Sequence, residues 1–134
     1  MRANQKLFLL LAGLFAGVNA EAAGPTVTSA FKFEDPVTHK LVPILAARMD
    51  QFVCLSVRAV LVPAGEHQLH LTIYDGLGSE VYTSTNRTIA SNLSLGRVMC
   101  YGFDKDHDAP GTWWYVVELD GEPLVSTSIE VRSN

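Results

Sequence analysis

The C-terminal part of the chain, residues 110–132, contains two β-prone segments on either side of Asp120-Gly121. Both segments are rich in β-branched and aromatic residues, and an Asp-Gly pair between such segments is typical of a hairpin turn. An isolated hairpin is only marginally stable in water, so its apolar face requires a larger sheet and a second layer. The remainder of the chain offers only strands for that layer. The sequence therefore predicts an all-β sandwich.

The alternation in this hairpin also restricts its loop. The residues that share one face are Trp113, Tyr115 and Val117 in the first segment and Val125, Thr127 and Ile129 in the second. A two-residue loop would pair odd positions with even ones, and a slip of one residue turns a whole strand over. An odd-length loop keeps these residues together. We therefore predict a three-residue loop with Gly121 left-handed in a bulge.

Further strand-like segments precede the hairpin and are separated by turn residues. They cover residues 26–33, 51–62, 67–75, 80–84 and 97–103. In the second of these, the alternation puts Leu61 on the apolar face with Val53 and Leu55. Residues 41–50 fit either an edge strand or an irregular crossing, since Pro43 interrupts them. Residues 86–95 are polar and are expected to form a loop or a weak strand. The total is about seven strands.

This pattern, with no convincing helix, resembles an immunoglobulin-like antiparallel β-sandwich. The ending Gly-Thr-Trp-Trp-Tyr-Val-Val-Glu-Leu-Asp-Gly-Glu-Pro-Leu is similar to the last hairpin of bacterial periplasmic immunoglobulin-like domains of an uncharacterised family. The resemblance implies a domain that binds or connects, and it carries no catalytic residues. The sequence departs from antibody-type domains, because no Tyr lies two residues before Cys100.

The N-terminus has the form of a secretory signal peptide. Arg2 and Lys6 precede an apolar segment, which is followed by two small-x-small cleavage triplets, Val18-Asn19-Ala20 and Ala20-Glu21-Ala22. Residues 1–22 are therefore predicted to be a signal peptide cleaved near 20–23, since the apolar segment is short for a membrane anchor. Residues 23–134 then form one domain. The predicted location is the bacterial periplasm or the medium, with no stable membrane insertion after cleavage.

The two cysteines, Cys54 and Cys100, are predicted to form a disulfide, because an even pair in an oxidising compartment favours one. The alternation of their segments puts both on the outer side of a sheet. Neighbouring strands of one sheet would then carry the bridge. The alternative is two separate thiols, because sequence alone does not fix their distance.

Composition and motifs narrow the function classes. The chain has 134 residues, a net charge of -4 and no basic cluster, which argues against nucleic-acid binding. It contains no Gly-x-Ser-x-Gly, no His-Glu-x-x-His and no Gly-rich phosphate loop. We therefore expect a non-enzymatic protein without a cofactor.

Two stretches are candidates for binding. Trp114 and Val116 lie on the face opposite Trp113, where an exposed pair would contact a protein partner of the cell envelope; alternatively, residues 41–50 cross over and cover Trp114. The acidic segment with Asp104, Asp106 and Asp108 could supply oxygen ligands to a metal ion, or it could be a solvated loop. The favoured function is a secreted or periplasmic module that binds a protein. The alternative is a small-ligand binder, for a metal ion or a glycan, that uses the acidic loop or exposed aromatic residues.

Overall fold

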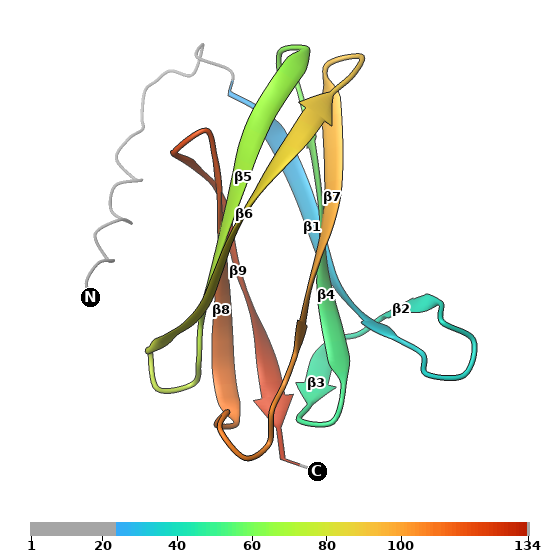
Figure 1. The fold of residues 1–134 in the computed structure, drawn as a ribbon, viewed down its shortest axis with the longest axis vertical. Coiled ribbons are helices and arrows are strands. Elements are labelled where there is room, and N and C mark those ends of the chain that lie inside the picture. The colour runs from blue at the N-terminus through green and yellow to red at the C-terminus, as the bar shows by residue number, and fades with distance from the viewer. Residues whose placement is uncertain (1–23, 134) are drawn as a thin grey trace.

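The computed structural model describes residues 24–133, and these form two packed β-sheets (Figure 1). Within these residues there are nine strands and no helix, so the expected all-β sandwich is confirmed. The strands are β1 (Thr26–Glu34), β2 (Leu41–Pro43), β3 (Ala46–Arg48), β4 (Phe52–Val60), β5 (Gly65–Tyr74), β6 (Glu80–Ala90), β7 (Ser94–Gly102), β8 (Gly111–Leu119) and β9 (Glu122–Arg132). Seven of them correspond to the expected strands, and β2 and β3 come from the ambiguous residues 41–50.

One sheet has the strand order β2-β1-β4-β7 and the other has the order β3-β9-β8-β5-β6. The segment from Leu41 to Arg48 passes from the first sheet to the second. It pairs antiparallel with β1 through β2, and then parallel with β9 through β3. Two strands of three residues therefore close one side of the sandwich. The opposite side is bounded by the long edge strands β6 and β7.

The C-terminal hairpin differs from its prediction in the position of the extra residue. Leu119 pairs with Glu122, so the loop is the two-residue Asp120-Gly121, and both of its residues have positive φ. The register then shifts between Val117 and Glu118, which restores the odd-with-odd pairing of Trp113 with Ile129. The predicted three-residue loop is wrong, whereas the shared face and the left-handed Gly121 are confirmed. The extra residue, which was expected in the loop, lies instead in a bulge inside β9.

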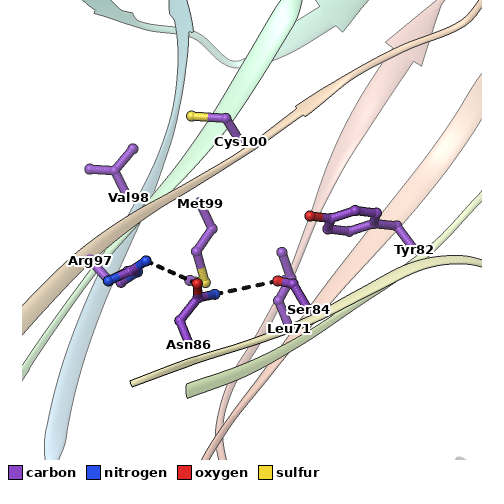
Figure 2. Close-up of a pocket in the computed structure, with 8 residues that line it drawn as sticks. All are labelled: Leu71, Tyr82, Ser84, Asn86, Arg97, Val98, Met99 and Cys100. Atoms are coloured by element: carbon purple, nitrogen blue, oxygen red, sulfur yellow. Dashed lines mark hydrogen bonds between the residues drawn. The ribbon is translucent and has the colours of Figure 1, made fainter. Parts of the chain in front are cut away.

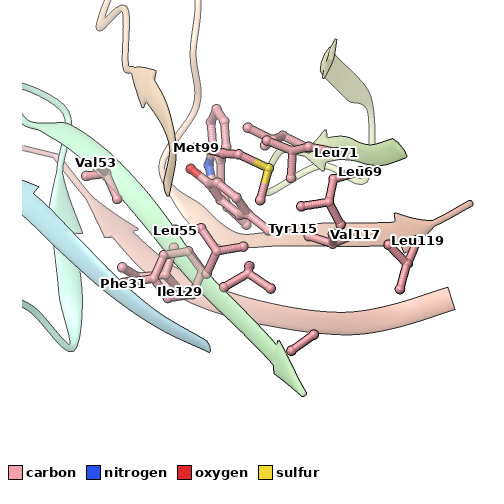
Figure 3. Close-up of a cluster of buried hydrophobic side chains, with 14 of the residues drawn as sticks. Phe31, Val53, Leu55, Leu69, Leu71, Met99, Tyr115, Val117, Leu119 and Ile129 are labelled. Carbon is pink, nitrogen blue, oxygen red and sulfur yellow. The ribbon is translucent and has the colours of Figure 1, made fainter. Parts of the chain in front are cut away.

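The apolar residues of the two inner faces form the core (Figure 3). Trp113 and Tyr115 are its largest fully buried side chains, and the ring of Phe31 meets that of Tyr115 edge-on at 5.0 Å between centroids. Leu61 was expected in this core but is exposed, because its positive φ of 66° ends the alternation of β4. Val62 is buried in its place.

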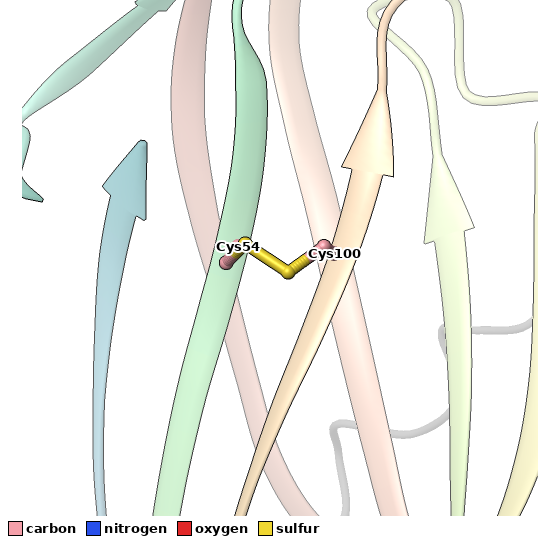
Figure 4. Close-up of a disulfide and its surroundings, with 2 residues drawn as sticks. All are labelled: Cys54 and Cys100. Carbon is pink, nitrogen blue, oxygen red and sulfur yellow. A yellow bond between two sulfur atoms is a disulfide. The ribbon is translucent and has the colours of Figure 1, made fainter. Parts of the chain in front are cut away.

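Cys54 and Cys100 form the predicted disulfide (Figure 4). They are direct register partners on the adjacent strands β4 and β7, so the bridge lies within one sheet. The two residues are 46 positions apart in sequence. A loop of that length corresponds to a stabilisation of about 4 kcal/mol in the chain-entropy account.

The strand β6 was only half recognised from the sequence. The prediction ended a short strand at Ser84 and expected a loop or weak strand from Asn86, but β6 continues to Ala90. It is an edge strand with several solvated side chains, such as Thr85 and Arg87, so polar residues are compatible with it. Only near its end does it bury residues, Thr88 and Ala90.

The predicted signal peptide, residues 1–22, lies outside the described residues. Within residues 24–133, the structure has no helix that is long and apolar enough to span a membrane.

Candidate functional site

The acidic loop between β7 and β8 turns its carboxylates back onto its own backbone. Asp104 accepts a hydrogen bond from the Asp106 N–H at 2.9 Å and lies 2.7 Å from Nδ1 of His107. The backbone hydrogen bond, and then His107, lower the pKa of Asp104. Asp108 accepts hydrogen bonds from the Asp104 N–H at 2.8 Å and from the Tyr101 hydroxyl at 3.1 Å. These carboxylates hold the loop together.

The same geometry gives no support to a metal site formed by Asp104, Asp106 and Asp108. Across residues 24–133, no three His, Cys, Asp or Glu side chains are positioned to hold a metal ion. The loop is instead anchored to the sandwich from two strands. Trp113 on β8 donates from its indole nitrogen to the Ala109 carbonyl at 2.7 Å, and Tyr101 on β7 donates to Asp108. Burial, and then the charge of Asp108, raise the pKa of Tyr101 to about 12.

A second polar cluster joins the tip of the β8–β9 hairpin to β5. His67 lies 2.6 Å from a carboxylate oxygen of Asp120 and 2.6 Å from the Pro63 carbonyl. Since both partners are acceptors, these contacts favour the charged imidazole, in which both ring nitrogens donate. The bond to Asp120 and the bond to Pro63 raise the pKa of His67. The bond from His67 and the Gln68 N–H lower the pKa of Asp120. This cluster has a structural role at the end of the sandwich.

The outer face of the second sheet carries Trp114 as the alternation predicted. Its residue surface is 46% exposed, so the segment 41–50 does not cover it; that segment instead reaches the sheet at its far edge through β3. In register, Trp114 lies between Tyr74 on β5 and Ser128 on β9. The neighbouring outward position is Val116, which is half-buried.

Around this apolar centre the outer face is rich in hydroxyl groups. The register pairs Val116 with Thr72 and with Ser126, and Thr72 in turn with Thr83 on the edge strand. The result is a sheet face with one exposed indole ring, one neighbouring phenol ring and small polar side chains around them. A surface of this kind can contact a protein or the flat face of a sugar ring.

A second feature, which the sequence did not indicate, lies on the open side between β6 and β7. These strands share a tight turn, in which Ser91 and Ser94 exchange backbone hydrogen bonds of 2.8 and 3.1 Å. Below the turn they separate into different sheets (Figure 1). Two side-chain bridges cross the widening gap between them. Arg97 donates to the Asn86 side-chain oxygen at 2.9 Å, and the rings of Tyr82 and Tyr101 lie 5.4 Å apart.

Beside the Arg97–Asn86 bridge and Tyr82 lies a cavity of about 160 Å³ (Figure 2). The residues that line it are Leu71, Tyr82, Ser84, Asn86, Arg97, Val98, Met99 and Cys100. The small Ser84 lies between the larger Tyr82 and Asn86 along β6, and it leaves the space that the neighbours do not fill. The cavity therefore combines the apolar side chains of Leu71 and Met99 with a hydroxyl, an amide and a guanidinium.

Comparison with known proteins agrees with the architecture. The sequence matches no family model and no curated protein. The structure is similar to that of an immunoglobulin-like protein from Pseudomonas aeruginosa, with a TM-score of 0.56 and 13% sequence identity; the match covers 82% of this chain and 98% of that one. The chain therefore folds as an immunoglobulin-like β-sandwich, the fold that the sequence predicted.

Proposed function

We propose that this chain is a non-catalytic immunoglobulin-like module of the bacterial envelope that binds a protein partner. The observation that carries the proposal is Trp114, a large aromatic side chain that is 46% exposed on the outer face of a sheet. Burial of this indole ring against a partner would be favourable, because it would remove apolar surface from water. Trp is also among the residues that contribute most where proteins bind one another.

The surroundings of Trp114 support this reading. Tyr74 and Val116 extend the apolar area, and Thr72, Ser126 and Ser128 form a polar rim around it. Apolar centres with polar rims are the usual anatomy of a protein interface. The disulfide within the first sheet fits an oxidising compartment, as does the predicted signal peptide.

The proposal is tested by capture from envelope extracts with three forms of the immobilised protein. These are the wild type, Trp114→Ala, and the control Val37→Ala, which removes an apolar side chain that is 84% exposed in the β1–β2 turn. We expect a protein captured by the wild type and by the control, and lost with Trp114→Ala. Capture of the same proteins in the same amounts by all three forms would contradict the proposal.

A glycan is the second candidate ligand for the same face, because Trp114 and Tyr74 are register partners on adjacent strands. Two neighbouring aromatic rings on one sheet face offer a stacking surface, and the surrounding hydroxyl groups can donate and accept hydrogen bonds. Migration through native gels that contain purified cell-wall polysaccharide distinguishes this candidate. Retardation that Trp114→Ala abolishes would favour the glycan, and unchanged migration would exclude it for the polysaccharides used.

A further inference from the structure

We propose that the cavity between β6 and β7 receives an acidic side chain from an extended peptide that adds to the free edge of β7. This inference rests on the proposed function, since it specifies a second contact with a protein partner. It goes beyond that function by naming the chemistry of the ligand and the residue that recognises it. Arg97 is that residue.

Arg97 carries a charge that the described part of the chain does not neutralise. It lies on the inward side of β7 with Leu95 and Met99, both buried, and it is itself only partly exposed. Its one hydrogen-bond partner among residues 24–133 is the uncharged side-chain oxygen of Asn86, and no ion pair there includes it. A guanidinium group has five donors in a planar fork that matches a carboxylate. Most of these donors remain available at the mouth of the cavity.

The size of the cavity favours a side chain over a free metabolite. At about 160 Å³ it is smaller than the 300–1,000 Å³ typical of small-molecule sites. Ser84 and the Tyr82 hydroxyl lie beside it, so a carboxylate that reaches Arg97 would find further polar contacts. Leu71 and Met99 supply an apolar contact for the methylene groups of a glutamate.

The edge of β7 beside the cavity supplies the rest of the site. β7 is the last strand of its sheet, and its nine residues pair with β4 in one uninterrupted register. It contains no proline and no bulge, two of the devices that protect an edge from added strands. The inward-pointing charge of Arg97 is a third such device, and an acidic side chain on the added strand would neutralise it. An extended peptide on this edge would gain backbone hydrogen bonds. Alternate side chains of such a peptide would point inward, towards the cavity.

The test uses synthetic peptides about ten residues long, enough to span β7, with alternating threonine and valine and flanking lysines for solubility. One central valine is replaced by glutamate in the first peptide and by glutamine in the second. Binding of the full chain to each immobilised peptide is measured by interferometry. We expect the wild type to bind the glutamate peptide about tenfold more tightly, as a charge-assisted hydrogen bond to a carboxylate provides.

Three variants assign that preference to the cavity. Arg97→Gln should remove it, and Ser84→Leu should weaken binding by filling the cavity while Arg97 remains. The control Arg87→Gln should keep it, because Arg87 points outward from β6 and pairs with Glu66 at 2.8 Å. Near-ultraviolet circular dichroism and thermal melts identify any variant that fails to fold. N-methylation of alternate amides in the glutamate peptide should abolish binding if the backbone pairs with β7.

The inference is overturned if the wild type binds both peptides equally or neither, if the preference survives Arg97→Gln, or if millimolar free glutamate displaces the peptide. These results are separate from the capture experiment with Trp114→Ala. Trp114-dependent capture without peptide binding removes only the present inference. Peptide preference without Trp114-dependent capture removes the assignment of the partner to the outer face of the second sheet.

Discussion

Replacement of Tyr115 by phenylalanine should stabilise the protein. The Tyr115 ring is fully buried in the core, and its hydroxyl oxygen has no hydrogen-bond partner within the part of the chain that the structure describes. Burial raises the pKa of this hydroxyl, so it stays neutral. A buried polar group without a partner costs about 1–3 kcal/mol, and Tyr115→Phe removes it while keeping the ring contact with Phe31.

The opposing effect is the space that the oxygen vacates. Cavities cost about 24 cal/mol per Å³, so a void the size of one oxygen atom costs a few tenths of a kcal/mol. The net expectation is a gain of about 1 kcal/mol in the free energy of unfolding, or roughly 4 °C in Tm for a domain of this size. Urea unfolding followed by tryptophan fluorescence, and a thermal melt, measure both quantities.

The matched comparison is Tyr101→Phe, which removes a hydroxyl that does have a partner. The Tyr101 hydroxyl donates to Asp108 at 3.1 Å and helps to anchor the acidic loop. Its loss should lower the free energy of unfolding by about 1 kcal/mol. If Tyr115→Phe were as destabilising as Tyr101→Phe, the hydroxyl of Tyr115 would have a partner, and the reasoning above would be refuted.

Three further changes test other parts of the structure. The pKa of His67 is raised from 6.5, so the stability that His67 contributes is complete below pH 6.5 and is lost as the pH rises through the pKa of the folded state. The pKa of Asp120 is lowered from 3.8, so the stability that Asp120 contributes is complete above pH 3.8 and is lost as the pH falls through the pKa of the folded state. His67→Gln should therefore flatten both limbs of the curve of unfolding free energy against pH; a curve that keeps its shape would argue against the pair. Reduction of the disulfide should cost roughly 4 kcal/mol in urea unfolding, and no change would show that the bridge does not restrain the unfolded chain. Gly76→Ala should destabilise the folded protein by about 1–3 kcal/mol in thermal melts, because the added Cβ would lie 2.6 Å from the Pro110 carbonyl oxygen. An unchanged Tm would show that the β5–β6 loop, which contains Gly76, can move away from the β7–β8 loop, which contains Pro110, without cost.

The sequence predicted which residues share a face, but it did not predict where irregularities fall. Alternation placed Trp113, Tyr115 and Val117 inside and Trp114 outside, because side-chain direction follows directly from extended backbone. The same alternation required an extra residue in the hairpin without locating it. A three-residue loop and a two-residue loop followed by a bulge satisfy the same parity, and the structure has the bulge.

The open-side cavity could not be predicted in the same way. It depends on the angle at which β6 and β7 separate after their shared turn, and on the small size of Ser84 at the point where the gap is wide enough. Residues 86–95 are polar because an edge strand needs few buried residues, and that pattern does not indicate that Asn86 lies opposite Arg97. The direction of the two cysteines was easier to predict, since it depends on the alternation of each strand alone. The pairing of β4 with β7 that brings them together does not follow from local pattern.

The segment Leu41–Arg48 has a consequence for how the molecule comes apart. Because it is hydrogen-bonded to β1 through β2 and to β9 through β3, the two layers are joined there by continuous backbone. On the opposite margin, only side chains and one short turn connect β6 to β7. Transient separation of the layers should therefore begin along that margin and leave the joined side intact. Amide protons of β7 should exchange with deuterium sooner than those of β1, and the ligand proposed for the cavity would slow that exchange.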